Sequence, residues 1–412
     1  MDTPAVYIPM DRRQALVHQG DFPDRVQGAA LFADISGFTP LTEALVRELG
    51  AQRGAEELTR FLNLVYDDVI DEVHRFGGSV IAFAGDAITC WFDDDDGRRA
   101  ATAALAMQEA MRPFASLNTP GGATVSLAMK AAVATGAARR FLVGDPAQRV
   151  IDALAGETLT RLAAAEHQAA KGEVIVDATT LAALQDASIG EQCVGAALNE
   201  TFTVLHALAQ PSSPASWPLI DPAALTESAV RPWVLAPVYE RLRSGLGDFL
   251  AELRPTVALF LRFGGIDYDG DEQAGARLDA YIRWVQLIVA RYDGTLIDLN
   301  IGDKGSYLYI NFGAPLAHEN DAERAAATAL ALCAPSDHLA FMGDVQIGIS
   351  QGRMRAGAYG RPNTAFVQSA RTQPTADCAS CRHFAPCPAP WRPHALTLMP
   401  PFTRTTAVVY AS

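Results

Sequence analysis

Apolar residues along the chain form short continuous runs and longer stretches with helical spacing. A short run ends near Asp34 and predicts a β-strand. The stretch 55–76 predicts an amphipathic helix, with apolar residues at Leu58, Phe61, Leu62, Val65, Val69 and Val73. Two β-rich runs then meet at Gly85-Asp86, a dipeptide suited to a hairpin turn. An Ala-rich helix and a strand near 130–135 complete the unit, which is typical of an α+β sheet covered by helices.

The same order of elements recurs in the second half of the chain, which indicates a duplicated domain. Segments of the first half have counterparts in the same order: Ala29–Phe38 with Val257–Ile266, Arg75–Phe92 with Arg291–Phe312, Arg98–Met107 with Glu323–Leu332, and Lys130–Gly136 with Gln346–Gly352.

The repeat and the breaks in composition divide the chain into parts. They are an N-terminal extension (1–24), a first unit (25–185), a connector with a helical stretch (186–251), a second unit (252–360) and a tail (361–412). The tail is rich in Pro and contains no Gly, Lys or Glu, so we expect that it does not continue the packing of the second unit. Out-of-frame translation and a diverged terminus are alternative origins for this composition.

Composition narrows the class of protein. The chain has 412 residues, enough for about two or three domains, and its formal net charge of −14 argues against a nucleic-acid partner. No apolar run is as long as a membrane span, and the N-terminal sequence lacks the regions of a signal peptide. Six cysteines without a disulfide-like framework indicate a reducing compartment, so we expect a cytoplasmic protein.

Two carboxylates of the first unit are candidates for chemistry. Asp34 closes the first strand and Asp86 lies in the hairpin turn, so both meet at one edge of the sheet if these strands are neighbours. Carboxylates there would bind a divalent cation, and the backbone amides of 35–39 would hold phosphate. The alternative is that Asp34 is a capping residue and Asp86 a turn residue, without a ligand.

The motifs LFADISGFT, GGSVIAFAGDAI and a following ATG strand together resemble class III nucleotidyl cyclases. The resemblance covers residues 25–360, and the tandem arrangement is similar to the soluble adenylyl cyclase type. It implies two ferredoxin-like units that pair as a pseudo-symmetric intramolecular dimer. It also implies conversion of ATP to 3′,5′-cyclic AMP and pyrophosphate, with two Mg²⁺ or Mn²⁺ ions, in intracellular signal transduction.

The resemblance assigns roles to residues of the first unit. It gives Asp34, Ile35 and Asp86 as metal ligands, with the two aspartates as the catalytic pair. It gives the following residues as nucleotide-binding: Ile35, Ser36, Gly37, Phe38, Thr39 and Gly85. In the second unit Arg262 stands where the first has Asp34, although Asp303 matches Asp86, so we expect a single metal-bearing site.

Base recognition should come from the second unit, through a Lys on the strand before its hairpin. The aligned residue is Asp298, which would accept hydrogen bonds from guanine, and this leaves GTP open as the substrate. The family's Asn and Arg, which orient the ribose and stabilise charge in the transition state, are missing. Thr160 and Ala164 stand at those places in the first unit, where the resemblance implies such a loss for the metal-bearing half. In the second unit no Asn or Arg stands at the required spacing after Arg371.

Two further features bear on function. Bicarbonate-responsive relatives use a Lys and an Arg where this chain has Ala82 and Ala163, so we expect no such response. The tail contains Cys378, Cys381, His383 and Cys387, whose spacing suits zinc or an iron–sulfur cluster, although it lacks the flanking turn glycines. The alternative function is a catalytically inactive cyclase-like module that binds nucleotide or regulates a partner.

Overall fold

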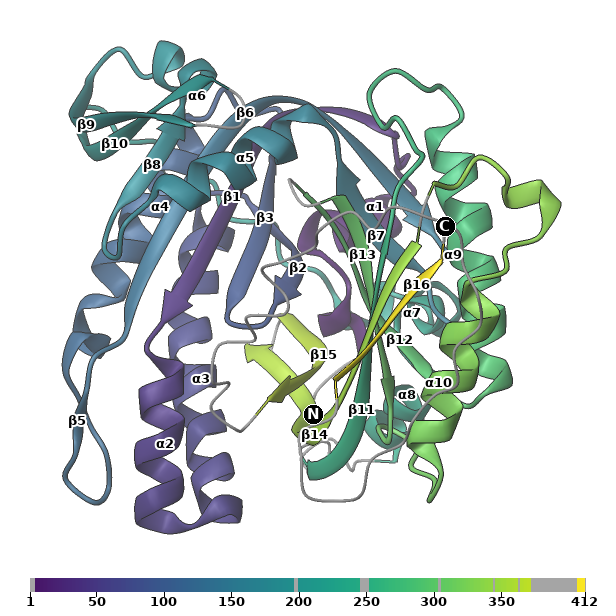
Figure 1. Ribbon diagram of the computed structural model, residues 1–412. Coiled ribbons are helices and arrows are strands. Elements are labelled where there is room, and N and C mark those ends of the chain that lie inside the picture. The colour runs from purple at the N-terminus through teal and green to yellow at the C-terminus, as the bar shows by residue number, and fades with distance from the viewer. Residues whose placement is uncertain are drawn as a thin grey trace.

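The computed structural model describes residues 4–195, 199–244, 252–302, 305–343, 345–361, 364–371 and 406–411. The candidate second-unit acid Asp303 and the tail residues Cys378, Cys381, His383 and Cys387 lie outside the described residues. Two sheets face each other across the middle of the molecule, and most helices lie on their outer sides (Figure 1).

The first sheet has the order β2-β3-β1-β6-β8-β10-β9, with β7 paired to β6, and the strands that the sequence predicts are β1, β2, β3 and β6. Its strands are β1 (Arg25–Ser36), β2 (Ser79–Ala84), β3 (Ala87–Asp93), β6 (Ala128–Val143), β7 (Ile151–Ala155), β8 (Val174–Asp177), β9 (Ala187–Gly195) and β10 (Glu200–Leu208). A small separate hairpin joins β4 (Leu117–Asn118) and β5 (Thr124–Val125). The pairs β1–β3 and β1–β6 are antiparallel, as expected for this fold class.

Alternation along β1 decides which side chains face the helices. Leu31, Ala33 and Ile35 point into a core formed with the helices on one face. These helices are α2 (Phe38–Leu49), α3 (Ala51–Arg75) and α4 (Arg98–Ala110). Asp34 and Phe32 point to the opposite face, where Phe32 packs against a second cluster that includes residues of α5 (Glu157–Gln168). The alternation therefore turns Asp34 away from the main core.

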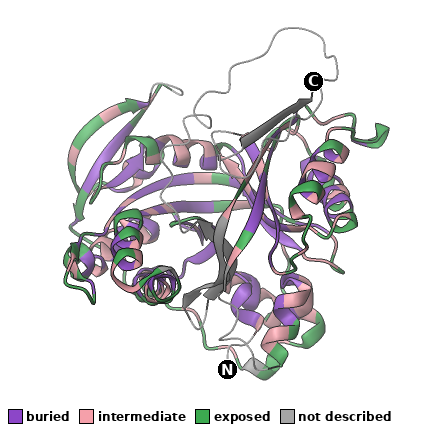
Figure 2. Ribbon diagram, turned by 60° about the horizontal axis from the view of Figure 1, so that its bottom comes forward, coloured by how far each residue is buried: buried purple, intermediate pink, exposed green. Residues whose placement is uncertain are grey.

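The second sheet has the order β12-β13-β11-β14-β15, with β16 paired to β14, and its first four strands repeat the order β2-β3-β1-β6. The strands are β11 (Glu252–Phe263), β12 (Thr295–Gly302), β13 (Gly305–Phe312), β14 (Val345–Arg361), β15 (Thr364–Arg371) and β16 (Thr406–Ala411). α9 (Ala274–Arg291) and α10 (Asp321–Leu332) cover its outer face and share a core with the sheet. Figure 2 shows buried residues along the strands and on parts of the helices.

Register supports the alignment of the two units. Asp34 lies opposite Lys130 across the β1–β6 pair, and Arg262 lies opposite Gln346 across the β11–β14 pair. Irregularities also fall at matching places, between Val80 and Ala82 in β2 and between Leu296 and Asp298 in β12. The mixed α+β fold predicted from the sequence is confirmed, with antiparallel-rich sheets covered by helices.

Two stretches differ from the expected organisation. β9 and β10 lie in the predicted connector, yet β10 pairs with β8 and extends the first sheet, because Phe202 and Leu205 enter its cores. In the tail, β15 and β16 both pair with β14, so these parts add to the second sheet. Their β-rich runs, TAFVQSAR and TAVVYA, outweigh the break in composition.

The N-terminal extension and the end of the connector pack together. Residues of 4–8 share a cluster with α8 (Ala236–Arg243), with Val150 and with Ile297 of the second unit. α1 (Met10–His18) is anchored to β6 and β7 by buried ion pairs: Arg12 and Arg140 both contact Asp152, and Arg140 also contacts Asp11. The helices α6 (Ala178–Ala183) and α7 (Glu227–Val230) complete the fold.

Candidate functional site

The candidate site begins where β1 ends and α2 starts. Ile35 donates its backbone N–H to the carbonyl of Asp86 at 3.2 Å, and Asp34 lies opposite Ala87 in the β1–β3 pair. These two contacts hold the hairpin turn against the end of β1. The structure therefore brings the two predicted aspartates together, from segments that are far apart in the sequence.

The turn after Asp34 requires glycine at one position. Gly37 has φ of 109°, and a Cβ there would lie 2.4 Å from the carbonyl oxygen of Ser126. Gly85 in the hairpin also has positive φ, 72°, but nothing lies near its Cβ position. Glycine is thus needed for backbone conformation at both turns, and for close packing only at Gly37.

The predicted phosphate-binding segment is partly occupied by its own contacts. The Ile35 amide is used by Asp86, the hydroxyl of Ser36 donates to the carbonyl of Ala128, and Phe38 is buried in the core. Thr39 is exposed, and the amides of Phe38 and Thr39 lie in the first turn of α2, where a helix has no internal partner for them. The first turn of α2 is the part of this segment best suited to an anion.

Charge at the site is set by side chains that the sequence analysis did not single out. Lys130 places its Nζ 3.7 Å from Oδ2 of Asp34 and forms an ion pair with Glu166 of α5. Glu166 also lies 3.4 Å from the Nδ1 atom of His167. Lys130 sits directly across the sheet from Asp34, a neighbour that only strand register reveals.

The pKa values of both aspartates are raised. Loss of hydration raises the pKa of Asp34, and the ammonium of Lys130 opposes that rise. The pKa of Asp86 is raised to about 6, mainly by loss of hydration and secondly by the negative charge of Asp34. Asp34 therefore makes Asp86 harder to ionise, and Glu166 does the same to Asp34. A divalent cation between Asp34 and Asp86 would relieve this repulsion.

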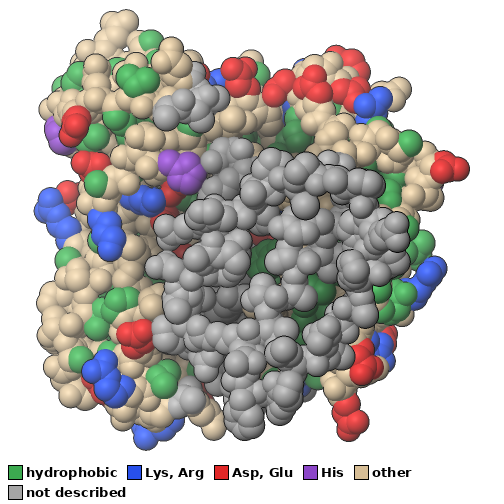
Figure 3. All heavy atoms as spheres, in the orientation of Figure 1, with side chains coloured by type: hydrophobic (Ala, Val, Ile, Leu, Met, Phe, Trp, Pro, Cys, Tyr) green, Lys and Arg blue, Asp and Glu red, His purple; other side chains and the backbone are tan. Residues whose placement is uncertain are grey.

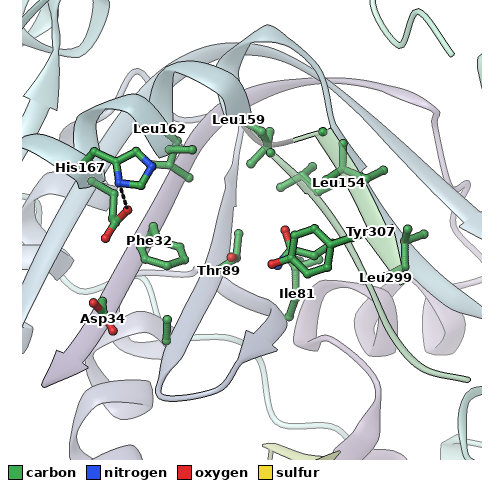
Figure 4. Close-up of a pocket in the computed structure, with 18 of the residues that line it drawn as sticks. Phe32, Asp34, Ile81, Thr89, Leu154, Leu159, Leu162, His167, Leu299 and Tyr307 are labelled. Atoms are coloured by element: carbon green, nitrogen blue, oxygen red, sulfur yellow. Dashed lines mark ion pairs between the residues drawn. The ribbon is translucent and has the colours of Figure 1, made fainter. Parts of the chain in front are cut away.

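A cavity of about 300 Å³ extends from Asp34 between the two units. Its walls come from β1, β2, β3, β7 and α5 of the first unit and from the β12–β13 hairpin of the second. Figure 4 shows Asp34 and His167 toward one end, with Leu154, Leu299 and Tyr307 toward the other. Most of the lining is apolar, as in a typical small-molecule pocket.

The positions linked to bicarbonate lie in this same cavity. Ala82 and Ala163 both line it, from β2 and α5 respectively. Neither side chain carries the positive charge that an anion would need, and the ionisable lining residues are Asp34, Asp152, Glu166, His167 and Tyr307. The absence of a bicarbonate response stays a prediction, and the structure places the two positions concerned in the wall of this cavity.

Asp298 does not line the cavity. It follows the irregularity in β12 and lies close to Arg149, whose guanidinium donates to the carbonyl of Ile297 at 2.8 Å. Burial raises the pKa of Asp298 to about 7, while the charge of Arg149 opposes the rise. The structure thus places the predicted base-recognition residue within the electrostatic influence of an Arg of the first unit.

The predicted ribose and transition-state positions fall on α5 in the first unit. Gly156 precedes α5, and Thr160 and Ala164 lie within it. The corresponding stretch of the second unit, after Arg371, lies outside the described residues.

The donor set at Asp34 and Asp86 fits a divalent cation bound together with phosphate. Among the described residues, no group of three or more His, Cys, Asp or Glu side chains could hold a metal ion by itself. Two carboxylates, with substrate oxygens completing the shell, are instead the arrangement that Mg²⁺ favours. Asp34 and Asp86 would hold the ion, and Ile35, the third ligand that the resemblance implies, directly follows Asp34.

The surface gives two further observations. On the described part of the face in Figure 3, Lys and Arg side chains lie among Asp and Glu side chains. No helix in the described ranges has both the length and the apolar character needed to cross a membrane.

Comparisons with known proteins give similarity over part of the chain. Over 79 residues the chain is 40% identical to adenylate cyclase type 10 of Rattus norvegicus, which covers 18% of this chain and 5% of that protein. Over 67 residues it is 42% identical to adenylate cyclase type 10 of Homo sapiens, which covers 16% and 4%. The chain thus matches about a twentieth of the length of these relatives. No protein-family model matches the chain.

One solved structure resembles most of the chain. It is a class III adenylyl cyclase-like ATP-binding protein from Pseudomonas aeruginosa, with a TM-score of 0.50 and 13% sequence identity. The match covers 84% of this chain and 79% of that one. At this identity the likeness concerns the fold, and it extends over both sheets.

Proposed function

We propose, from the premise that this chain is a relative of the class III nucleotidyl cyclases, that it converts ATP to 3′,5′-cyclic AMP and pyrophosphate. The observation that carries the proposal is the approach of Asp34 and Asp86 at the end of β1, beside the first turn of α2. Carboxylates and helix-start amides in one place suit a nucleoside triphosphate with its divalent ion.

Each residue has a proposed task. Asp34 and Asp86 would bind Mg²⁺ or Mn²⁺, which offsets the charge of the triphosphate and favours attack by the ribose 3′-hydroxyl. The amides of Phe38 and Thr39 would hold phosphate oxygens, and Gly37 shapes the turn that presents them. The cavity walls would exclude water from the bound nucleotide.

We propose further that the two units pair within one chain. In support, Arg139 of β6 donates to the carbonyls of Tyr268 and Asp271 at 3.0 and 3.2 Å. Gly144 donates its amide to Asp279 of α9 at 2.8 Å. These bonds join the first unit to residues just before and within α9, so the cavity between the units would keep its shape.

The alternative is nucleotide binding without turnover. It is favoured by the second unit, which has no Asn or Arg at the required spacing after Arg371, and by the resemblance to a protein described as ATP-binding and cyclase-like. GTP is a second possible substrate, because the carboxylate of Asp298 suits guanine, but Asp298 would have to reach the base from outside the lining of the cavity.

One assay separates these functions. Purified chain is incubated with Mn²⁺ and either ATP or GTP, and the products are analysed by mass spectrometry. Cyclic AMP from ATP, lost in Asp34→Asn and kept in the surface control Glu57→Gln, is the expected result. Cyclic GMP alone would identify the chain as a guanylyl cyclase. Nucleotide binding at equilibrium with neither product would replace the proposal with the binding function.

A further inference from the structure

Lys130 holds an unusual position for a cation beside a metal site. It lies in register opposite Asp34, and its Nζ is 3.7 Å from the carboxylate that the proposed function gives to a divalent ion. Asp34, Lys130 and Glu166 have side chains that are 28%, 23% and 15% exposed, so water screens their charges incompletely. A metal ion and the Lys130 ammonium would therefore compete for Asp34.

Glu166 offers the ammonium a second partner. It projects from α5, which packs over the sheet face that carries Asp34, and it forms a closer ion pair with Lys130 than Asp34 does. The Lys130 ammonium thus bridges two carboxylates that come from different elements. When a divalent ion occupies Asp34, the ammonium still has Glu166 as its counter-charge.

We propose that Lys130 is the built-in counter-ion of the metal site: it neutralises Asp34 when no metal is bound and is retained by Glu166 when metal binds. This inference rests on the proposed function, since it takes Asp34 as a metal ligand. Lys130 and Glu166 are positioning residues, which set how tightly the first ion is held.

The second unit supports the idea by contrast. There Arg262 takes the place of Asp34, and Gln346, which is neutral, takes the place of Lys130. Arg262 Nη1 lies 3.5 Å from Oε1 of Gln346. A Lys at this position therefore occurs in the unit that has the acid. This is expected if the Lys is a counter-ion to the acid, and not if the strand pair needs a Lys at this position in order to fold.

The test is Mn²⁺ binding to the nucleotide-free full chain, followed by electron paramagnetic resonance. Lys130→Met should tighten Mn²⁺ binding about tenfold, because the competing charge is removed. Glu166→Gln should weaken it by about three- to fivefold, because Lys130 then rests on Asp34 alone. Lys171→Met is the matched control, since this exposed Lys influences Asp34 without an ion pair to it, and should change binding less than twofold.

A double-mutant cycle separates the counter-ion role from a simple change of net charge. Glu166→Gln in the Lys130→Met background should have no more effect than Lys171→Met alone. Independent, additive effects of the two substitutions would overturn the inference. Lys130→Gln, with folding checked by circular dichroism, guards against a variant that fails to fold.

Failure of the inference and failure of the proposed function are distinguishable. If Asp34→Asn abolishes Mn²⁺ binding while Lys130→Met leaves it unchanged, the metal site stands and the counter-ion role is overturned. If neither the natural chain nor Lys130→Met binds Mn²⁺, either alone or with a non-hydrolysable ATP analogue, both are overturned.

Discussion

The ends of β1 and β11 are alike in backbone and opposite in charge. Gly37 and Gly265 occupy the same place after these strands, with φ of 109° and 95°, and in each a Cβ would lie 2.4 Å from a backbone carbonyl oxygen. Asp34 and Arg262, which precede them, are an acid and a base. The fold therefore demands the turn in both units, whereas it tolerates either charge, so we expect the acid to serve chemistry rather than folding.

The largest expected effect is on the rate of cyclic nucleotide formation, when the charged residue at the end of β1 or β11 is replaced by a neutral one. Asp34→Asn should lower formation of cyclic nucleotide at least about 10³-fold, because a metal ligand is lost. Arg262→Gln should change it less than about threefold, since that side chain is exposed and its hydrogen bond to Gln346 is long, 3.5 Å. Initial rates with Mn²⁺ and ATP check both variants, and equal losses in the two would contradict the asymmetry.

Replacing either turn glycine by alanine should lower the free energy of unfolding by a similar amount. Gly37→Ala and Gly265→Ala should each cost about 2–4 kcal/mol, from a strained φ and a close carbonyl. Urea denaturation measures the cost. At temperatures where both variants remain folded, Gly37→Ala alone should also weaken nucleotide binding. A stable Gly37→Ala protein would show that the turn is less constrained than its geometry indicates.

The pH dependence of metal binding should report Asp86. Its pKa of about 6 lies above the ordinary value of 3.8, so a proton competes with the cation below pH 6. Mn²⁺ affinity should be nearly constant above pH 7 and fall by up to about tenfold per pH unit below about 6. Titrations at several pH values test this, and a fall that begins only near pH 4 would mean that Asp86 keeps an ordinary pKa.

The smallest effect concerns the contact between the units at α5. Asp269 of the second unit accepts a hydrogen bond from the Glu157 amide at 3.2 Å, and so caps a helix of the first unit. Asp269→Ala should lower the free energy of unfolding by about 0.5–2 kcal/mol. Glu157→Gln, which changes an exposed carboxylate on the same helix turn, is the control and should cost less than about 0.5 kcal/mol. Identical unfolding curves for Asp269→Ala and the natural chain would show that Asp269 does not stabilise the start of α5.

Much of the fold could be predicted because its signals are local. Apolar spacing predicted the long helix that forms α3, and the Gly85-Asp86 dipeptide predicted the β2–β3 hairpin. The approach of Asp34 and Asp86 followed from two elements that each end at a turn. β9 and β10 were not predicted, because the residues that bury them, Phe202 and Leu205, give only a short apolar pattern.

The remainder of the site depends on register and on distant packing. The sequence did not predict Lys130 as a site residue, because only the β1–β6 register places it opposite Asp34. Glu166 reaches it because α5 lies over that face of the sheet. The hydrogen bond from Arg149 to the carbonyl of Ile297, which brings Arg149 near Asp298, likewise joins the two units, and no local pattern encodes it.

The central claim is that one unit of the two holds metal, between Asp34 and Asp86. The most direct test is an anomalous difference map from crystals of the chain grown with Mn²⁺ and a non-hydrolysable ATP analogue. We expect Mn²⁺ peaks between the carboxylates of Asp34 and Asp86, against the analogue's phosphates, and none beside Arg262. Peaks beside Arg262, or an analogue bound with no metal at Asp34, would contradict the account.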